Sequence, residues 1–412
     1  MIHTWRTLLG MADSVGRLEV ETDVCVIGSG AGGSAAAYRL AKKGKKVTLL
    51  ETGSFLLPRD FNQREEAMFS RLFYDSGGRR TADFGVRILH GHGVGGSTLH
   101  NINLCKRIPD EIVEEWDLPG LSVRELAPFY AEVEDLLRVT DVDQSQMNTA
   151  NRLFQAGVEK LGYRGGMLRH NRVGCVGSGF CELGCAFDAK MNAAKILIPE
   201  FVNAGGQVFA NTRVIDLERS GRKIVRARAR LVAPDQISRF LGPEVVISAK
   251  SFVLACGAIE TPALIRRSGL PDRGGLVGTR LYLHPGAAVA GKFSEPVESW
   301  KGVPQSYECT EFLDFSHQSA GARRIWIFGG SAHPAGAASF VPGIGEAHAE
   351  AMSRYPNLLP LSIMLHDEST GHVQPRAELG VRVDYALNSR DRELMAQGIR
   401  ETCKILLAAG AT

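Results

Sequence analysis

The chain has 412 residues, enough for two or three domains and a substantial buried core. Its formal net charge is only +3, and no block of like charges would attract DNA or RNA. Hydrophobic residues make up 44% and charged residues 23%, and no apolar run is long enough to span a bilayer. Composition therefore argues against a disordered chain, a nucleic-acid-binding protein and a protein with a transmembrane segment.

The numbers of cysteines and glycines indicate the cellular compartment and the kind of backbone conformation to expect. Eight cysteines are too few for a disulfide scaffold in a chain of this length, and residues 1–23 contain neither a sustained apolar core nor a small-residue cleavage site. We therefore expect a cytoplasmic protein. Glycine accounts for 46 residues, which predicts many positions with positive φ or a close approach to a ligand.

The first predicted elements form a βαβ unit. Residues 23–28 (DVCVIG) and 46–51 (KVTLLE) are short apolar strands, and residues 31–43 between them have helical spacing. A strand, helix and strand in this order predict a parallel sheet.

A glycine-rich turn joins the first strand to the helix. Gly28 permits the tight turn, Gly30 lets the backbone approach a pyrophosphate, and Gly33 allows close packing of helix on strand. Glu51 ends the second strand, where a carboxylate would accept a hydrogen bond from the adenosine ribose. The pattern predicts a dinucleotide, either FAD or NAD.

A second glycine-rich segment, residues 90–101 (HGHGVGGSTLHN), follows. Glycines at 91, 93, 95 and 96 predict a loop laid flat against a bulky planar or anionic group. The alternative is a flexible surface loop, which the interleaved apolar residues Val94 and Leu99 disfavour.

Further along the chain, helices are expected at residues 123–139 and 151–162. Strands are expected at 207–210, 212–217, 223–232, 244–248, 251–257, 324–328 and 361–365. Residues 251–257 form a buried strand that returns to the nucleotide sheet, so the nucleotide domain is predicted to be discontinuous. Gly257 ends that strand, and Thr261-Pro262 marks the start of the next helix.

These motifs together resemble the glucose–methanol–choline (GMC) oxidoreductases, which oxidise alcohols with FAD. Residues 94–101 resemble the family's first signature, and residues 257–270 resemble the second, with Pro271 where the family has Gly. The His284-Pro285 pair fits the segment that follows. The resemblance runs from about residue 22 to the end of the chain and favours FAD over NAD.

The resemblance implies an α/β fold with a discontinuous, Rossmann-like parallel sheet for FAD and a second α+β substrate domain with an antiparallel sheet. The expected boundaries are a leader segment at 1–20, an FAD-binding domain at 21–290 with a helical insertion at about 110–205, and an incomplete substrate domain at 291–412. The expected FAD-binding residues are Gly28, Gly30, Gly33, Glu51, Val94, Gly95, Gly96, Ser97, Thr98, His100, Asn101, Val214, Gly257 and Ala258.

His100 stands where some family members carry a histidine bonded covalently to the flavin. The resemblance therefore suggests covalent FAD, and the alternative is a histidine that packs beside the flavin ring. Asn101 is expected beside the flavin, and His92 replaces the usual Arg or Lys.

Three cysteines, Cys175, Cys181 and Cys185, are spaced like ligands of a metal or an iron–sulfur cluster. Three thiolates are one short of the usual four, so a bound metal is not the favoured interpretation. The alternative is a Gly/Cys turn that lines the flavin site and ends at Lys190.

No catalytic residue is assigned within the chain. The family's base, a His, and its His or Asn partner would lie beyond Thr412, so we expect a chain that is truncated or completed by another polypeptide. The main hypothesis is an FAD-dependent alcohol oxidase or dehydrogenase whose small-molecule substrate is a primary or secondary alcohol, with an electron-acceptor protein or second chain as a further partner. The alternatives are a non-catalytic FAD-binding subunit and an NAD-dependent dehydrogenase.

Overall fold

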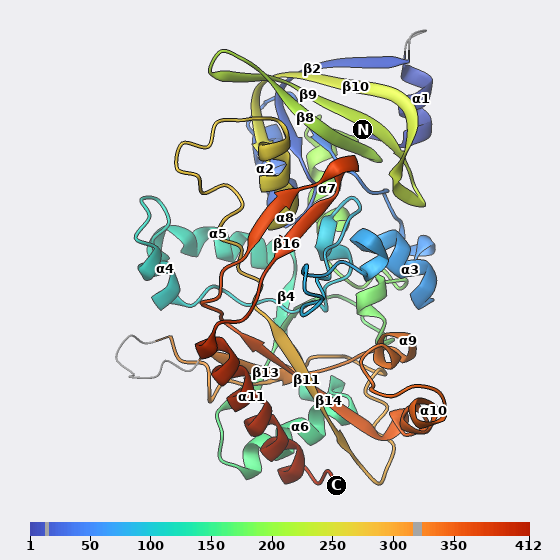
Figure 1. Ribbon diagram of the computed structural model, residues 1–412, viewed down its shortest axis with the longest axis vertical. Helices are drawn as coiled ribbons and strands as arrows, with labels where there is room; N and C mark the ends of the chain where they lie inside the picture. Colours follow the sequence, from blue (N-terminus) through green and yellow to red (C-terminus); the bar gives the residue numbers. More distant parts are fainter. Residues whose placement is uncertain (13–15, 316–323) are drawn as a thin grey trace.

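The computed structural model describes residues 1–12, 16–315 and 324–412. Two sheets lie at opposite ends of the molecule's long axis, with the C-terminus beside the second (Figure 1). The first sheet has seven strands in the order β1-β7-β3-β2-β10-β9-β8. Its strands are β1 (Ile2–His3), β7 (Gln207–Phe209), β3 (Val47–Leu50), β2 (Arg17–Ile27), β10 (Gln236–Leu254), β9 (Lys223–Ala233) and β8 (Thr212–Ser220).

The first five strands of this order are parallel, whereas β9 and β8 are antiparallel additions at one edge. Successive side chains of β2 face opposite sides: Val24 and Val26 enter one apolar core, and Cys25 and Ile27 enter the other. Burial on both faces explains why the strand is a nearly continuous apolar run.

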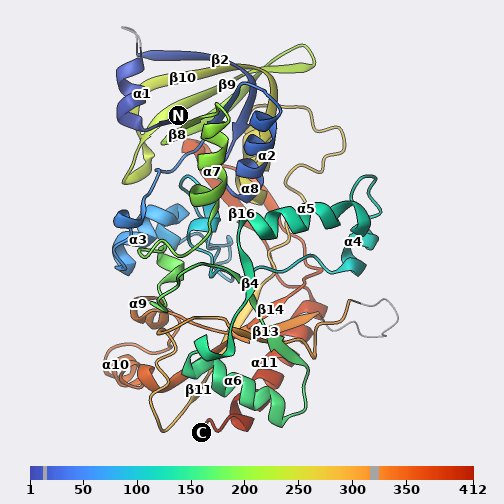
Figure 2. The same ribbon diagram turned by 180° about the vertical axis from the view of Figure 1, so that it is seen from behind.

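Helices cover both faces of the seven-stranded sheet. On one face, α2 (Ala31–Lys42) and α7 (Ala193–Asn203) lie side by side (Figure 2). On the other, α1 (Trp5–Met11) and α8 (Gly257–Arg267) contribute Leu8 and Leu264 to the core. This is the doubly covered α/β architecture expected from the βαβ pattern.

The second sheet is antiparallel, with five strands in the order β11-β14-β13-β12-β5. Every second residue of β14 is buried, from Leu359 to Leu365, as period-2 alternation requires. The helices α6 and α11 pack on this sheet and on each other. The elements are β11 (Gly286–Lys292), β14 (Leu358–Leu365), β13 (Ile325–Gly329), β12 (Tyr307–Cys309), β5 (Gly165–Met167), α6 (Thr149–Lys160) and α11 (Ser389–Ala408).

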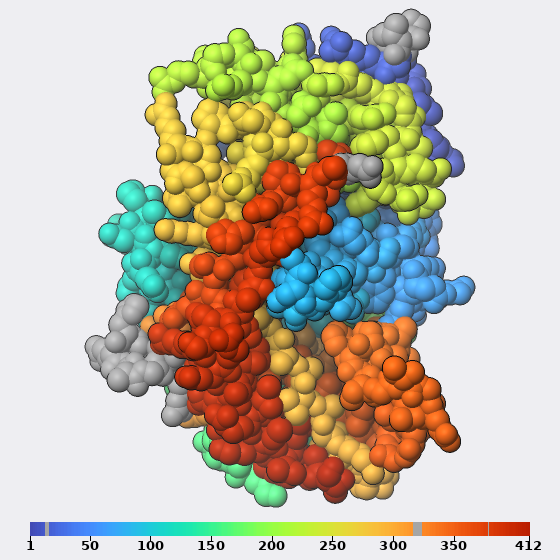
Figure 3. All heavy atoms as spheres, viewed as in Figure 1, coloured from blue at the N-terminus to red at the C-terminus, as the bar shows by residue number. Residues whose placement is uncertain are grey.

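The remaining elements lie between or beside the two sheets. Two strand pairs, β15 with β16 and β4 with β6, are antiparallel ribbons. In Figure 3 the ribbon of β15 and β16 runs beside the segment around residues 80–90, and Ala82 N–H donates to the Val383 carbonyl at 2.8 Å. Bounds are β4 (Val139–Asp141), β6 (Arg169–Asn171), β15 (His372–Pro375), β16 (Val381–Asp384), α3 (Glu65–Leu72), α4 (Asp110–Trp116), α5 (Val123–Leu136), α9 (Pro334–Ala338) and α10 (Glu346–Ser353).

Three features differ from expectation. Residues 1–20, expected as a leader, contribute strands to the first sheet: β1 pairs with β7 through Ile2 and Val208, and β2 begins at Arg17. The strands expected at 244–248 and 251–257 are parts of one strand, because both pair with β2 in a single register. Residues 149–167, which precede the expected boundary at 290, lie with the second sheet because α6 and β5 bury their apolar faces there.

Within the described residues, no helix combines the length and apolar character needed to cross a membrane.

Candidate functional site

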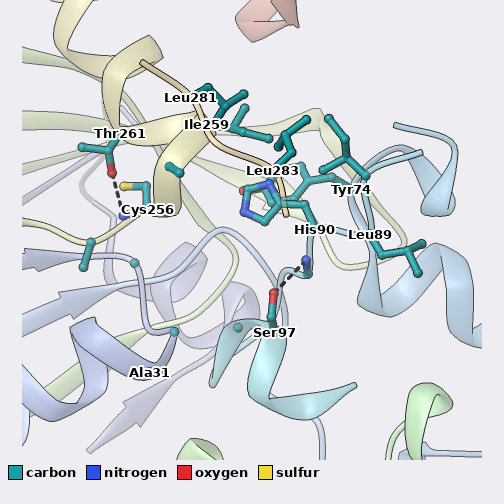
Figure 4. Close-up of a pocket in the computed structure, with 18 of the residues that line it drawn as sticks. Ala31, Tyr74, Leu89, His90, Ser97, Cys256, Ile259, Thr261, Leu281 and Leu283 are labelled. Carbon is teal, nitrogen blue, oxygen red and sulfur yellow. Dashed lines mark hydrogen bonds between the residues drawn. The ribbon is translucent and has the colours of Figure 1, made fainter. Parts of the chain in front are cut away.

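A cavity of about 1380 Å³ opens where the carboxyl ends of β2, β3 and β10 meet the loop at residues 90–101 (Figure 4). This is the edge at which open α/β sheets bind ligands. The first turn of α8 and the segment at residues 281–286 form the opposite wall. The cavity is lined by nine of the residues expected to bind FAD: Gly28, Gly30, Glu51, Gly96, Ser97, Thr98, Val214, Gly257 and Ala258.

The turn from β2 into α2 has no room for a side chain at Gly28 or Gly33. Gly28 has φ +98°, and a Cβ there would lie 2.4 Å from the Ala255 carbonyl oxygen. A Cβ on Gly33 would lie 1.9 Å from the Gly28 oxygen, so Gly33 packs beneath the turn and not in the cavity. Gly30, by contrast, has open space where a side chain would be, at the N-terminus of α2.

The second glycine-rich loop is pressed against the first. A Cβ on Gly96 would lie 2.7 Å from the Gly30 Cα, and the Gly95 N–H donates to Ser29 Oγ at 3.0 Å. Val94 is fully buried. The flexible-loop alternative is therefore wrong, because this loop is part of the core beneath the cavity.

Glu51 lines the cavity, but protein donors occupy its carboxylate. Oε2 accepts hydrogen bonds from the backbone N–H and the hydroxyl of Ser29, and Oε1 accepts from the N–H groups of Gly53 and Gly93. A carboxylate offers about four acceptor positions, and all four are used. Burial raises the pKa of Glu51. In this arrangement Glu51 holds the two glycine-rich loops together, and the expected ribose contact stays a prediction.

Lys190 is a fully buried cation behind the loop. Its three protons meet three backbone carbonyls, of Leu99 at 2.9 Å, Asn101 at 2.5 Å and Cys181 at 2.8 Å. Burial lowers the pKa of Lys190 to about 8. Lys190 therefore ties the cofactor loop to the cysteine-rich segment.

His100 and Asn101 lie behind the residues that line the cavity. The His100 ring packs against Phe73, with ring centroids 4.1 Å apart, and its Nε2 faces Gly91 and has no hydrogen-bond partner among the described residues. Burial lowers the pKa of His100 to about 3. Packing beside the flavin ring and covalent attachment to it both stay predictions. Val94 and Gly95 also lie outside the lining.

The second signature helix begins earlier than expected. Its first helical residue is Gly257, and Pro262 lies inside the helix. Thr261 is not the cap that starts the helix: its Oγ1 accepts a hydrogen bond from the N–H of Cys256, one residue before the helix. Gly257, Ala258 and Ile259 of the first turn line the cavity, and Figure 4 shows the side chains of Cys256 and Ile259 beside it.

The cysteine-rich segment lies apart from the large cavity. Cys175, Cys181 and Cys185 line a separate cavity of about 20 Å³, together with Lys190. The described residues contain no group of three or more His, Cys, Asp or Glu side chains arranged to hold a metal. All eight cysteines are free thiols.

No sequence motif predicts the ion pair between Arg79 and Glu260 beside the cavity. Arg79 donates to Glu260 at 2.9 Å and to His90 Nδ1 at 3.1 Å, and His90 lines the cavity. Glu260 stands 181 positions from Arg79, so no local pattern signals the contact.

Comparison with known proteins decides the family. The model of the GMC oxidoreductase family matches residues 69–286, more than half of the chain, and an NAD(P)-binding Rossmann-like domain matches residues 26–100. The chain belongs to the GMC oxidoreductase family. Because this family depends on FAD, the cofactor is FAD, as expected, and not the NAD of the alternative hypothesis.

Relatives of this GMC oxidoreductase support the family assignment. It is 28% identical over 408 residues to a long-chain-alcohol oxidase of Arabidopsis thaliana, covering 95% of this chain and 52% of the relative. It is 32% identical over 401 residues to a GMC-type oxidoreductase of Mycobacterium tuberculosis, covering 94% and 60%. The chain thus spans about half to three fifths of the length of these relatives.

Solved structures share the fold. A pyridoxine 4-oxidase from Mesorbium loti has a TM-score of 0.65 at 17% identity, covering 94% of this chain and 82% of the other. A formate oxidase from Aspergillus oryzae has a TM-score of 0.69 at 14% identity, covering 94% and 81%. At these identities the likeness concerns the fold alone, and it confirms the expected two-part α/β architecture.

The cavity of this GMC oxidoreductase fits FAD. Gly28, Gly30 and Gly96 carry no side chain at the turn where a pyrophosphate would lie, and the N-termini of α2 and α8 would favour its negative charge. Ser97, Thr98, Gly257 and Ala258 would contact the rest of the dinucleotide.

Proposed function

We propose that this chain takes part in the oxidation of a CH–OH group of an alcohol, with transfer of a hydride to FAD. The observation that carries the proposal is the cavity at the carboxyl edge of the sheet, enclosed by both glycine-bearing family signatures. FAD supplies the hydride acceptor, N5 of its flavin ring. The residues of this chain bind that group, orient it and exclude water.

The glycine-rich turns do the binding. Gly28 makes the tight turn, with its own N–H donating to the Leu50 carbonyl, and Gly30 leaves open space for the pyrophosphate at the N-terminus of α2. Gly96 brings the second loop against this turn. Lys190 holds that loop from behind through the Leu99 and Asn101 carbonyls. A loop held in this way is oriented before the cofactor arrives, which reduces the entropy lost on binding.

The proposed substrate is an alcohol with an apolar body. Four large, exposed side chains belong to the cavity lining: Phe84, Leu89, Tyr282 and Phe340. Exposed apolar residues are ordinarily scattered, so their gathering at one cavity favours an apolar ligand. The long-chain-alcohol oxidases among the relatives support the same class.

No catalytic base is assigned to the described residues. Two histidines line the cavity, His90 and His284. The Nδ1 of His90 already accepts a hydrogen bond from Arg79, and burial lowers the pKa of His90 to about 4. A weakly basic imidazole with its acceptor occupied is a poor proton acceptor for an alcohol.

We propose a cytoplasmic location, supported by the eight free cysteines. An electron-acceptor protein or second chain remains a proposed partner. The alternative function is an FAD-binding subunit that needs another polypeptide for activity, favoured by the absence of an assigned base.

The test is the visible spectrum of the purified chain, followed by anaerobic addition of alcohols of increasing chain length. We expect flavin absorbance, bleached more by apolar than by sugar alcohols. Bound flavin that no alcohol bleaches would favour the alternative, and a folded, colourless protein that binds no added FAD would contradict both. After acid precipitation, colour in the pellet would indicate covalent FAD.

A further inference from the structure

His90 occupies a special position in the wall of the cavity. Its ring packs against Tyr74 at a tilt of 32°, with ring centroids 4.7 Å apart, and lies between that ring and the first turn of α8 (Figure 4). A Cβ on Gly257 would lie 3.4 Å from Nε2, so this edge of the imidazole faces the start of the helix. Among the described residues, no acceptor bonds Nε2.

Arg79 determines which ring nitrogen of His90 carries the proton. Its Nη1 lies 3.1 Å from His90 Nδ1 and donates a second hydrogen bond to Glu260 Oε1 at 2.9 Å. A guanidinium only donates, so Nδ1 must be the acceptor. A neutral imidazole with an unprotonated Nδ1 carries its proton on Nε2, the atom that faces the start of α8 in the wall of the cavity.

Arg79 is itself held in place. Its Nε donates to Asp75 at 3.0 Å, and its guanidinium stacks over the Tyr74 ring at 4.5 Å. The side chains of Arg79 and Glu260 are only 10% and 11% exposed, so the pair is well shielded from solvent. Pairing with Arg79 also neutralises Glu260, which would otherwise place an unpaired negative charge beside an anionic cofactor.

We propose that His90 binds the FAD dinucleotide as a neutral hydrogen-bond donor through Nε2–H, and that Arg79 is the positioning residue that fixes this tautomer. The inference rests on the proposed FAD binding and adds a binding residue to that site. The acceptor is an oxygen of the dinucleotide, because a fixed N–H beside the first turn of α8, whose N–H groups have no partner within the helix, attracts oxygen. The low pKa of His90 keeps the donor uncharged at neutral pH.

The first test reads the tautomer without FAD. In two-bond 15N spectra of the full chain labelled at histidine, the signals that disappear in His90→Gln belong to His90. We expect an acceptor-type shift at Nδ1 and a donor-type shift at Nε2. The reverse pattern, or an imidazolium at pH 7, would overturn the proposal.

The second test compares two isosteres. A Gln amide nitrogen can occupy the position of Nε2, whereas an Asn amide reaches only the position of Nδ1. FAD is added to deflavinated protein, and its dissociation constant is measured from the quenching of flavin fluorescence. We expect His90→Asn to weaken binding about 5- to 10-fold, the effect of one neutral hydrogen bond, and His90→Gln to stay within about twofold of the unaltered chain.

The matched control is His372→Asn, at an exposed histidine of β15 that does not line the cavity. It should leave the FAD dissociation constant unchanged. The role of Nε2 would be overturned if His90→Asn bound FAD as tightly as the unaltered chain. It would also be overturned if His90→Asn and His90→Gln raised the FAD dissociation constant equally. Failure of the unaltered chain to bind FAD would instead overturn the proposed function, and the His90 proposal with it.

Discussion

At the scale of single residues, two positions decide whether the cofactor loops form. Gly33 is required because the Gly28 carbonyl occupies the place of its side chain, and Lys190 is required because three carbonyls converge on its ammonium group. Neither residue lines the large cavity. Both hold in place the backbone that lines the cavity.

We predict opposite effects of alanine at neighbouring glycines of α2. Gly33→Ala should lower the free energy of unfolding by about 3 kcal/mol, because a Cβ 1.9 Å from backbone forces the turn apart. Gly32→Ala is the matched control: nothing lies within 4 Å of its Cβ, and alanine favours a helix by up to about 1 kcal/mol. Urea denaturation measures both, and equal destabilisation would contradict the assigned packing.

Lys190→Met should destabilise the fold by about 2–4 kcal/mol, because three buried carbonyls lose their donor. The pH dependence has a definite sign. The pKa of Lys190 is lowered to about 8 in the fold, against roughly 10.4 in an unfolded chain. Between these values the unfolded chain binds more protons, so the contribution of Lys190 to stability rises with pH.

Urea denaturation of the unaltered chain and of Lys190→Met, at several pH values between about 7.5 and 10.5, checks this. The difference in unfolding free energy should grow as pH rises. Lys250→Met is the control, since that side chain is 82% exposed and should show no such trend. A constant difference for Lys190 would mean that its pKa is not lowered in the fold.

At the scale of elements, a carboxylate far along the chain positions the segment at residues 281–286. Asp367 accepts hydrogen bonds from the N–H groups of Leu283 and His284, and from the Tyr385 hydroxyl at 2.6 Å. His284 has φ +40°, a conformation that a residue other than glycine rarely adopts. The carboxylate therefore holds a strained turn against the cavity.

Asp367→Asn should loosen that turn, because an amide offers one acceptor oxygen in place of two. We expect faster hydrogen exchange in a peptide covering residues 281–286, measured by mass spectrometry, and a loss of about 1–2 kcal/mol in stability. Tyr385→Phe is the control, since it removes one donor and leaves both backbone contacts intact. Unchanged exchange in Asp367→Asn would show that other contacts hold the turn.

Element boundaries also show what a local pattern can reveal. The alternation of Leu359, Leu361 and Ile363 predicts their strand correctly, because period-2 burial is a local property. The start of α8 was misplaced at Thr261-Pro262, because a proline in the second turn of a helix resembles one at its first position. The Thr261 hydroxyl in fact bonds back to Cys256.

At the scale of the whole molecule, one cavity joins three distant stretches of the chain. Gly28, Ser97 and Gly257 come from separate motifs and line the same space. Their meeting follows from the parallel sheet, which brings strand ends to one edge. The second sheet and its helices lie at the other end of the molecule (Figure 1), and Ser339 and Phe340, from the segment after α9, also belong to the lining.

The sequence by itself determined the βαβ unit and the two glycine-rich turns, because each depends on near neighbours along the chain. The family resemblance followed from these motifs in combination. Only the tertiary structure decided that protein donors surround Glu51, that His100 packs against Phe73, and that Arg79 pairs with Glu260. The physical reason is the same in each case. A buried polar group must find a partner wherever the fold supplies one, and that partner is set by packing and not by spacing along the chain.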